Sequence, residues 1–341
     1  MRRHHSTQPD TPGISVLKPL RGLDPNTYDA FTSQAQQDYP QFEILFGVKE
    51  RNDAAIPQVR RLQAEFPAHN IKLIIGAPET PNGKAGMLME LARHASHPLL
   101  VVNDADIKVG PTYLSEVTAP LTGPAVGVVT CPYRAQPHTI PAFWESLGIA
   151  TDFIPSTLVA QILRIREFGF GSTLAFRAAD LESAGGFATV SDYVADDYQI
   201  AKRIAALGKR CLLSTYTVET ALGEASWNGI WLHQLRWART IRLTKGAAYA
   251  GLPLTHAGIW IVLAFLCRAS DIAGILFLLR TLSALITAGG VLRYALGAAF
   301  SWLAPVWDLY AFCVWLTSYA GTEVRWRDKT LRIGPNGRIL N

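Results

Sequence analysis

Residues 99–106 read LLVVNDAD. Four consecutive apolar residues are typical of a strand buried on both faces of a sheet. The polar residues Asn103, Asp104 and Asp106 stand where that strand ends. Similar short apolar runs occur along the chain, separated by amphipathic stretches of helical length. This alternation predicts an α/β fold with a Rossmann-like, mostly parallel sheet.

The alternating part begins at Ile14. We expect strands at residues 14–17, 43–48, 71–75, 99–102 and 127–130, and helices at residues 27–37, 54–66, 84–95 and 111–119. Ligands of such sheets bind beyond the carboxyl ends of the strands. Asp53 and the Asp104–Asp106 pair fall at those ends, which makes them candidate site residues.

Asp104 and Asp106 flank a single alanine. Carboxylate oxygens are the ligands that Mg²⁺ or Mn²⁺ prefers, and these ions commonly share protein carboxylates with substrate phosphates. A metal here would neutralise charge on a departing diphosphate. Two aspartates in a turn also serve simply to shape the loop. Their position after a buried strand favours the metal-binding interpretation.

A second acidic pair, Asp196 and Asp197, precedes a helical stretch at residues 199–207. Acids at a helix start can interact with the helix dipole. Alternatively, a carboxylate at a pocket can accept the proton of an attacking hydroxyl. Burial and a like-charged neighbour would raise the pKa of that base into a useful range.

A third group lies just before the most apolar part of the chain. On a helix, His233, Arg236 and Trp237 share one face, because they are three and four residues apart. Arg236 suits a pyrophosphate and Trp237 a sugar or lipid surface. The alternative is that these residues anchor the chain at a membrane interface.

The composition changes after Lys245. Residues 247–267, 272–292 and 294–322 contain almost no charged side chains, and each stretch approaches or exceeds the roughly 20 residues needed to cross a bilayer. Tryptophans and flanking arginines favour membrane segments over buried helices of a soluble core. Basic clusters on both sides predict an even number of crossings with both flanks cytosolic. The first stretch, with Pro253 and His256, is then expected to lie in the interface or to re-enter.

Another apolar stretch, residues 143–163, is interrupted by Glu145, Asp152 and Pro155. It is too broken to span a membrane. It is expected to form either a buried helix pair or an amphipathic surface that rests on the bilayer and receives a lipid.

The net charge is +5 and the sequence pI is about 9.0. No basic-aromatic motif accompanies this charge, so a nucleic-acid partner is disfavoured. The basic residues cluster next to the apolar region, as expected beside an anionic membrane surface. The four cysteines form no CxxC pair and fit a reducing, cytosolic catalytic face.

Several short motifs occur in a fixed order. They are VLKPLRG at 16–22, DPN at 24–26, DYP at 38–40, Asp53, Asp104, Asp197 and Arg236-Trp237. This series resembles the ceramide glucosyltransferases, and the chain is also similar to bacterial glycosyltransferases of hopanoid biosynthesis. The resemblance runs from about Ile14 to Trp326, which is nearly the whole chain.

The resemblance implies a GT-A fold, a membrane anchor and inversion at the sugar carbon. It implies that Asp53 binds the nucleotide, that Asp104 and Asp106 bind the metal and diphosphate, and that Asp197 is the catalytic base. The remaining donor-binding residues that it implies are Lys18, Pro19, Lys84, Gly171, Ser172, Arg236 and Trp237. For the acceptor it implies Asp196, His233 and Trp237.

The chain departs from the family pattern in three ways. His233 stands where Gln or Arg is usual, which shifts the acceptor toward a hopanoid. The stretch around Lys84 lacks a second asparagine. The usual N-terminal membrane helix is absent, and we expect either a shortened gene start or a C-terminal anchor that suffices alone.

We therefore expect a disordered segment at 1–13, a catalytic domain at 14–245, transmembrane or interfacial helices at 246–323 and a basic cytoplasmic tail at 324–341. The predicted activity is hexose transfer from a UDP-sugar to a lipid, with UDP-glucose and ceramide as substrates. One alternative is transfer of N-acetylglucosamine from UDP-GlcNAc to a hopanoid polyol. A processive polysaccharide synthase would need more membrane helices. A non-catalytic nucleotide-sugar-binding membrane protein is the alternative outside enzymes.

Overall fold

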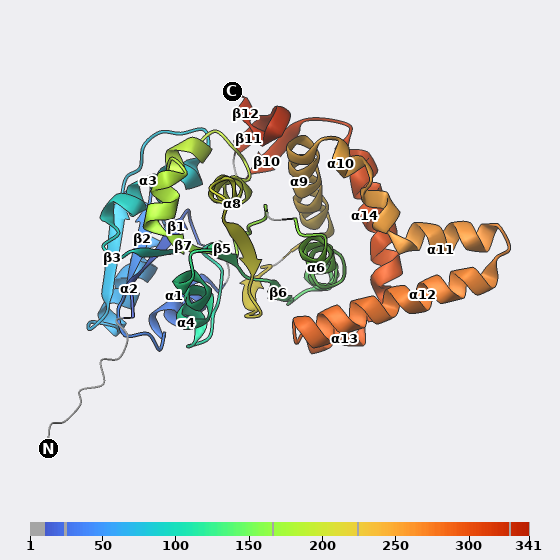
Figure 1. The fold of residues 1–341 in the computed structure, drawn as a ribbon, viewed down its shortest axis with the longest axis horizontal. Coiled ribbons are helices and arrows are strands. Elements are labelled where there is room, and N and C mark those ends of the chain that lie inside the picture. Colours follow the sequence, from blue (N-terminus) through green and yellow to red (C-terminus); the bar gives the residue numbers. More distant parts are fainter. Residues whose placement is uncertain (1–10, 24–25, 166, 224, 327–328, 341) are drawn as a thin grey trace, which may run out of the picture.

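The computed structural model describes residues 11–23, 26–165, 167–223, 225–326 and 329–340 (Figure 1). Most of the expected N-terminal segment, and Asp24 and Pro25 of the DPN motif, lie outside the described residues. The N-terminal part folds around a seven-stranded sheet of order β3-β2-β1-β4-β7-β5-β8. Its strands are β1 Ile14–Leu20, β2 Phe42–Val48, β3 Asn70–Ile75, β4 Leu99–Val102, β5 Val126–Thr130, β7 Leu174–Arg177 and β8 Arg210–Leu213.

The sheet is mostly parallel, as predicted. Strand β1 pairs in parallel with β2 and β4, β2 with β3, and β5 with β8. Strand β7, which the sequence analysis did not anticipate, runs antiparallel to both β4 and β5. A second, two-stranded parallel sheet joins β6 Tyr133–Gln136 to β9 Val218–Ala221.

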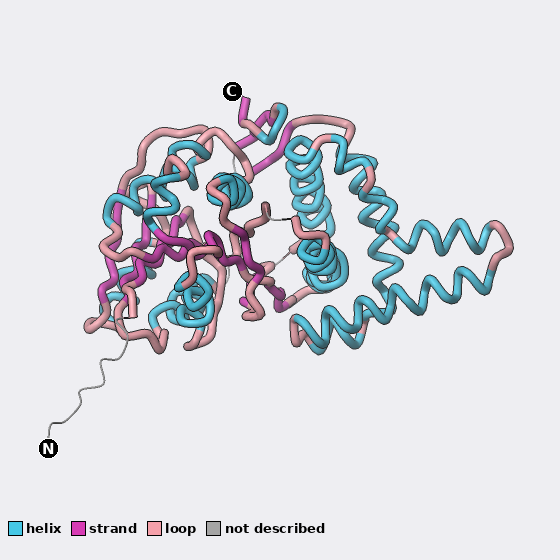
Figure 2. Tube along the Cα trace, in the orientation of Figure 1, coloured by secondary structure: helices cyan, strands magenta, loops and turns pink. Residues whose placement is uncertain are grey.

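Helices cover both faces of the large sheet (Figures 1 and 2). Neighbouring strand residues point to opposite faces, so Val16 belongs to one apolar core and Leu17 to the other. The first core includes side chains of α1 Thr27–Ala35, α2 Ile56–Glu65 and α4 Tyr113–Thr118. The second includes side chains of α3 Gly83–His94, α7 Ala178–Ser183 and α8 Asp196–Ala206. The expected helices are confirmed, with ends that differ by a few residues.

The interrupted apolar stretch forms a nearly continuous rod of α5 Ile140–Gly148, a π-helical turn at Ile149–Phe153, and α6 Ile154–Ile162. Its first half is buried, with Glu145 only 3% exposed. Its C-terminal end is exposed, with Ile162 at 78%. The expected buried arrangement therefore holds for the first half of the rod, while the second half leaves apolar side chains exposed.

The C-terminal part is helical. Its helices are α9 Trp227–Lys245, α10 Ala247–Ala250, α11 Ala257–Leu266, α12 Ser270–Leu285, α13 Ala295–Ala299 and α14 Ala304–Ser318, with short turns between them. Helices α11 and α12 form a hairpin that projects from the rest of the chain (Figure 1). Within the described ranges, one helix, Ser270–Val291, is long and apolar enough to cross a bilayer.

The first apolar stretch is bent by 57° between Ala247–Thr255 and Ala257–Leu266, at the place where re-entry was expected. Counting this bent pair as one span gives two candidates. The expectation of a membrane-length helix at residues 294–322 is wrong. That stretch is split into α13, a short turn and α14, and the 15 residues of α14 extend only about 22 Å.

Arg280 joins two of these helices and ties them to the N-terminal part of the chain. Arg280 on α12 lies 2.6 Å from Asp308 on α14 and also donates to the carbonyl of Thr151 at 2.8 Å. The last residues fold back as a small sheet of β10 Glu323–Trp326, β11 Lys329–Ile333 and β12 Ile339–Leu340. Ile339 donates its backbone N–H to the carbonyl of Asp192 at 2.7 Å, and Gln199 on α8 donates to the carbonyl of Asn336, so these residues pack beside the start of α8.

Candidate active site

The site centres on an ion pair between two elements. Asp104 follows β4, and its Oδ1 lies 2.6 Å from Nζ of Lys84 in the first turn of α3. The Asn82 side chain accepts the backbone N–H groups of Lys84 and Ala85, which caps the helix. Asn82 also donates to the carbonyl of Tyr193 at 2.7 Å. This cap fixes the start of α3 and thereby the position of Lys84.

A second lysine, Lys18, contacts the backbone of Asp104. Nζ of the fully buried Lys18 donates to the Asp104 carbonyl at 2.6 Å. Burial lowers the pKa of Lys18 to about 7, although the charges of Asp106 and Asp104 oppose that shift. Lys18, which was expected to contact the donor, is buried in β1, where its ammonium group binds the backbone of the Asp104 loop. Pro19 follows it and is only partly buried.

Asp106 lies two residues after Asp104 in the same loop and accepts a hydrogen bond from the Thr220 hydroxyl at 2.5 Å. Burial, and then the charge of Asp104, raise the pKa of Asp106. The Asp104 side chain is 45% exposed, so its oxygens are accessible. No group of three or more metal-ligating side chains occurs within the described ranges. Two hard oxygen donors, with phosphates completing the shell, nevertheless fit Mg²⁺ or Mn²⁺.

Gly171 borders Asp104. Its carbonyl accepts the Asp104 N–H at 2.9 Å, and a Cβ at this position would lie 2.4 Å from Asp104 Oδ2. A side chain at position 171 would therefore displace the Asp104 carboxylate from this position. Its neighbour Ser172 is buried and donates to the carbonyl of Cys131 at 2.9 Å.

Asp197 lies in the first turn of α8, as part of the second acidic pair. Burial, and then the like charge of Asp196, raise the pKa of Asp197 to about 6. The neighbouring charges of Lys84 and Asp104 also act on it. Asp197 therefore lies beside the Lys84–Asp104 pair, next in the chain to Asp196, whose Oδ2 is 3.8 Å from Lys84 Nζ.

Asp196, which was expected to bind the acceptor, is a buried residue beside Lys84. It is only 4% exposed, and its Oδ2 lies 3.8 Å from Lys84 Nζ. Its Oδ1 accepts from Asn82 at 3.4 Å. These contacts tie Asp196 to Lys84 and to the residue that caps α3.

Helix α9 carries His233, Arg236 and Trp237 beside the acidic residues of the site. The rings of His233 and Trp237 lie 4.8 Å apart, which confirms that they share a helix face. The charges of Asp104, Glu145 and Asp197 all act on the guanidinium of Arg236, although burial lowers its pKa. Arg236 thus supplies a positive charge beside the acids of the site.

Glu145 is a buried residue that the sequence analysis did not assign to the site. Its Oε1 lies 2.5 Å from Nδ1 of His233 and accepts from Gln234 at 2.8 Å. The sequence did contain a signal for Glu145, because a carboxylate within an apolar stretch needs a polar partner once it is buried. The identity of that partner depends on a contact across 88 residues.

Asp53 lies at the same edge of the sheet, beyond β2. Both of its carboxylate oxygens accept the N–H of Gly22 at 3.0 Å, and Oδ1 also accepts from Ala55 at 2.9 Å. Asp53 therefore shapes the loop after β1, whereas Asp104 and Asp197 gather around Lys84.

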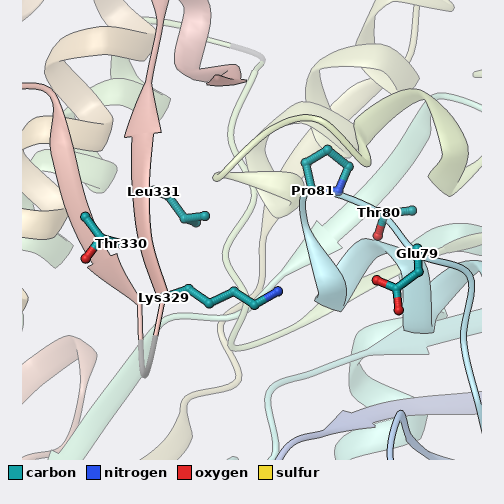
Figure 3. Close-up of a pocket in the computed structure, with 6 residues that line it drawn as sticks. All are labelled: Glu79, Thr80, Pro81, Lys329, Thr330 and Leu331. Atoms are coloured by element: carbon teal, nitrogen blue, oxygen red, sulfur yellow. The ribbon is translucent and has the colours of Figure 1, made fainter. Parts of the chain in front are cut away.

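An open groove of about 540 Å³ lies beside the segment that leads to Lys84 (Figure 3). Residues 79–81 form one wall, and Lys329, Thr330 and Leu331 of β11 form the other. The side chain of Lys329 extends across the groove toward Glu79 and Pro81 in the close-up (Figure 3). The C-terminal strands therefore border the approach to α3.

The fold and the acidic cluster at its strand ends define a glycosyltransferase of the GT-A class. A solved structure with the same fold is "Mannosyltransferase PcManGT from Pyrobaculum calidifontis in complex with GDP-Man and Mn2+", with a TM-score of 0.58 and 21% identity. The match covers 93% of this chain and 88% of that one. The chain belongs to glycosyl transferase family 21, whose profile matches residues 1–339.

Curated relatives agree with this family. Ceramide glucosyltransferase 1 of Caenorhabditis elegans is 29% identical over 220 residues, which are 63% of this chain and 47% of that protein. Ceramide glucosyltransferase 3 of the same organism is 27% identical over 221 residues, or 63% and 48%. The chain thus spans about half the length of these relatives.

Proposed function

We propose that this chain is a membrane-bound, inverting glycosyltransferase that moves a hexose from a UDP-sugar to a lipid hydroxyl, with UDP-glucose and ceramide as substrates. One observation carries the proposal. Lys84 Nζ lies 2.6 Å from Asp104 and 3.8 Å from Asp196, the neighbour of Asp197, so acids from two distant parts of the chain meet around one lysine. The charges of Asp104 and Asp197 also act on the guanidinium of Arg236. The names of the curated relatives support the choice of ceramide.

The reaction begins with Asp197, which accepts the proton of the acceptor hydroxyl. The hydroxyl oxygen forms a bond to the anomeric carbon while the bond from that carbon to the diphosphate oxygen breaks. The bonding electrons leave with UDP. A single displacement from the opposite face inverts the anomeric configuration.

The donor diphosphate meets the positive charges of Lys84 and Arg236. Asp104 and Asp106 would hold Mg²⁺ or Mn²⁺, which when bound neutralises charge on the leaving diphosphate. Asp53 binds the nucleotide, while Gly171 and Ser172 lie against the sugar. Lys18 and Pro19 support this pocket through β1.

The acceptor binds beside His233 and Trp237, where aromatic rings can contact a sugar or lipid surface. We assign residues 14–245 to the catalytic domain on the cytosolic face and 246–323 to membrane or interfacial helices. Strands β11 and β12 are expected to stay with the catalytic domain, because Ile339 donates its backbone N–H to the carbonyl of Asp192.

The test uses membranes that contain the full chain, labelled UDP-glucose or UDP-GlcNAc, and either ceramide or a hopanoid polyol. We expect labelled glucosylceramide, and none with Asp197→Asn. A product formed only from UDP-GlcNAc and the polyol would replace ceramide by a hopanoid, the acceptor that His233 favours. Failure with every lipid, despite binding of UDP-sugar, would indicate the non-catalytic alternative.

A further inference from the structure

The C-terminal end of α6 carries an exposed apolar surface, which we name the α6 edge. It consists of Val159, Ile162, Leu163 and Ile165, which are 51%, 78%, 68% and 47% exposed. Single exposed apolar residues are common on soluble proteins, but a contiguous group of large ones marks an interaction site. Four such side chains within seven positions of the chain make the α6 edge a candidate interaction surface.

The same chain segment leads directly from the α6 edge to the acidic cluster. A Cβ at Gly169 would lie 3.0 Å from the Asp197 carbonyl, and Gly171 contacts Asp104. Between them, the Phe170 ring lies 4.9 Å from that of Phe153. Only eight positions separate Leu163 from Gly171. The α6 edge is thus the outer end of a wall of the proposed active site.

The α6 edge also lies close to the start of the apolar C-terminal helices. Tyr198, the neighbour of Asp197, donates to Glu167 at 3.4 Å. Nζ of Lys245 lies 3.8 Å from the centroid of the Tyr198 ring. Lys245 is the last residue of α9, and the apolar region begins two residues later. The loop after α6 and the beginning of that region therefore converge on Tyr198.

Exposed basic side chains surround this point. Arg164 stands within the α6 edge, while Lys202 and Lys245 lie on α8 and α9. Apolar side chains flanked by lysine and arginine match the interface of a membrane with anionic headgroups. Because these basic side chains also lie near a helix of membrane-spanning length, a bilayer is favoured over a second protein as the partner of the α6 edge.

We propose that the α6 edge inserts into the bilayer surface, as a membrane contact separate from the α11–α12 hairpin. It keeps the mouth of the site against the membrane, so that the headgroup of the acceptor reaches Asp197 while its apolar chains stay in the bilayer. The statement about the acceptor rests on the proposed function. The statement about membrane contact does not.

The first test needs no enzymatic activity. The full chain, with Cys267→Ser and Cys313→Ser, carries Ile162→Cys labelled with an environment-sensitive fluorophore. The other two cysteines are buried. In vesicles of equal parts phosphatidylcholine and phosphatidylglycerol, we expect a blue shift and quenching by brominated lipid. A label on Arg60→Cys, an exposed residue of α2, is the control.

Equal, weak quenching at both labels would overturn the proposal. A blue shift at residue 162 that depends on protein concentration and not on brominated lipid would also overturn it, because it would indicate contact with a second copy.

The second test concerns the acceptor. The exposed pair Ile162→Asp and Leu163→Asp should reduce transfer to a long-chain acceptor in vesicles about tenfold or more, through KM. Transfer to a short-chain, water-soluble acceptor should remain. Leu207→Asp, which changes an exposed leucine elsewhere, should preserve both activities. An unchanged long-chain activity, or an equal loss with both acceptors, would contradict the proposed role. Quenched Ile162→Cys with an inactive wild type would reject the function and keep the membrane contact.

Discussion

Lys84 Nζ lies 2.6 Å from Asp104 Oδ1, and this ion pair joins the first turn of α3 to the loop that follows β4. Burial alone would lower the pKa of Lys84, but the charges of Asp104, Asp196 and Asp197 raise it above its ordinary value. The lysine therefore stays protonated. It presents a fixed positive charge where the proposed donor diphosphate binds.

Replacing Lys84 by Met should lower kcat/KM for the UDP-sugar by about 10- to 100-fold, because an electrostatic contact to the diphosphate is lost. The comparison is Lys49→Met, whose ammonium pairs with Glu79 at the surface. Steady-state kinetics at varied donor concentration measure both. Equal kinetics for the two variants would remove Lys84 from the donor site.

Asp197→Asn should abolish turnover, because the amide cannot accept the acceptor proton, while the affinity for UDP-sugar stays within a few-fold of wild type. Calorimetric titration and a transfer assay separate these effects. Asp192→Asn, at the partly exposed pair with Arg338, is the matched control and should stay active. An active Asp197→Asn enzyme would exclude Asp197 as the base.

The pH profile follows from the same carboxylate. The base works only when deprotonated, and burial followed by the charge of Asp196 raises the pKa of Asp197 to about 6. Activity should therefore be constant at neutral pH and fall as the pH drops through about 6. In Asp196→Asn the like charge is gone, so the acidic limb of kcat should move to lower pH. A limb that does not move would argue against this coupling.

Removal of divalent metal should stop transfer. We expect a chelator to abolish activity and Mn²⁺ or Mg²⁺ to restore it. Asp106→Asn should raise the metal concentration needed for half-maximal activity at least tenfold, because one of two carboxylate ligands is lost. Asp271→Asn, at the tip of the α11–α12 hairpin, should leave this concentration unchanged. Full activity in chelator would refute the metal assignment.

Glu145→Ala should leave the His233 and Gln234 side chains without their buried partner, at a cost of about 1–3 kcal/mol in the free energy of unfolding. Because these residues adjoin Arg236 and Trp237, kcat should fall about 10- to 100-fold. Glu145→Gln keeps an acceptor oxygen and should recover much of both. Thermal unfolding and kinetics provide the readouts. Wild-type kcat in Glu145→Ala would show that this contact does not position the site.

The sequence predicted the main strands well, because apolar runs such as residues 99–102 are buried on both faces. It missed β7 and β8, because each strand is only four residues long, and the antiparallel direction of β7 leaves no pattern in the chain. It overestimated the last membrane segment, because hydropathy does not reveal where a helix breaks. Asp308, which interrupts that stretch, instead pairs with Arg280 in the folded chain.

The sequence by itself determined the fold class, the family resemblance and the acids at the strand ends, since these depend on residue type and local periodicity. Only the tertiary structure decided which acid faces which partner. Lys84 forms ion pairs with Asp104 and Asp196. The buried Lys18 donates to the Asp104 carbonyl, and Glu145 contacts His233. Such contacts join residues far apart along the chain, and their geometry depends on how the helices pack on the sheet.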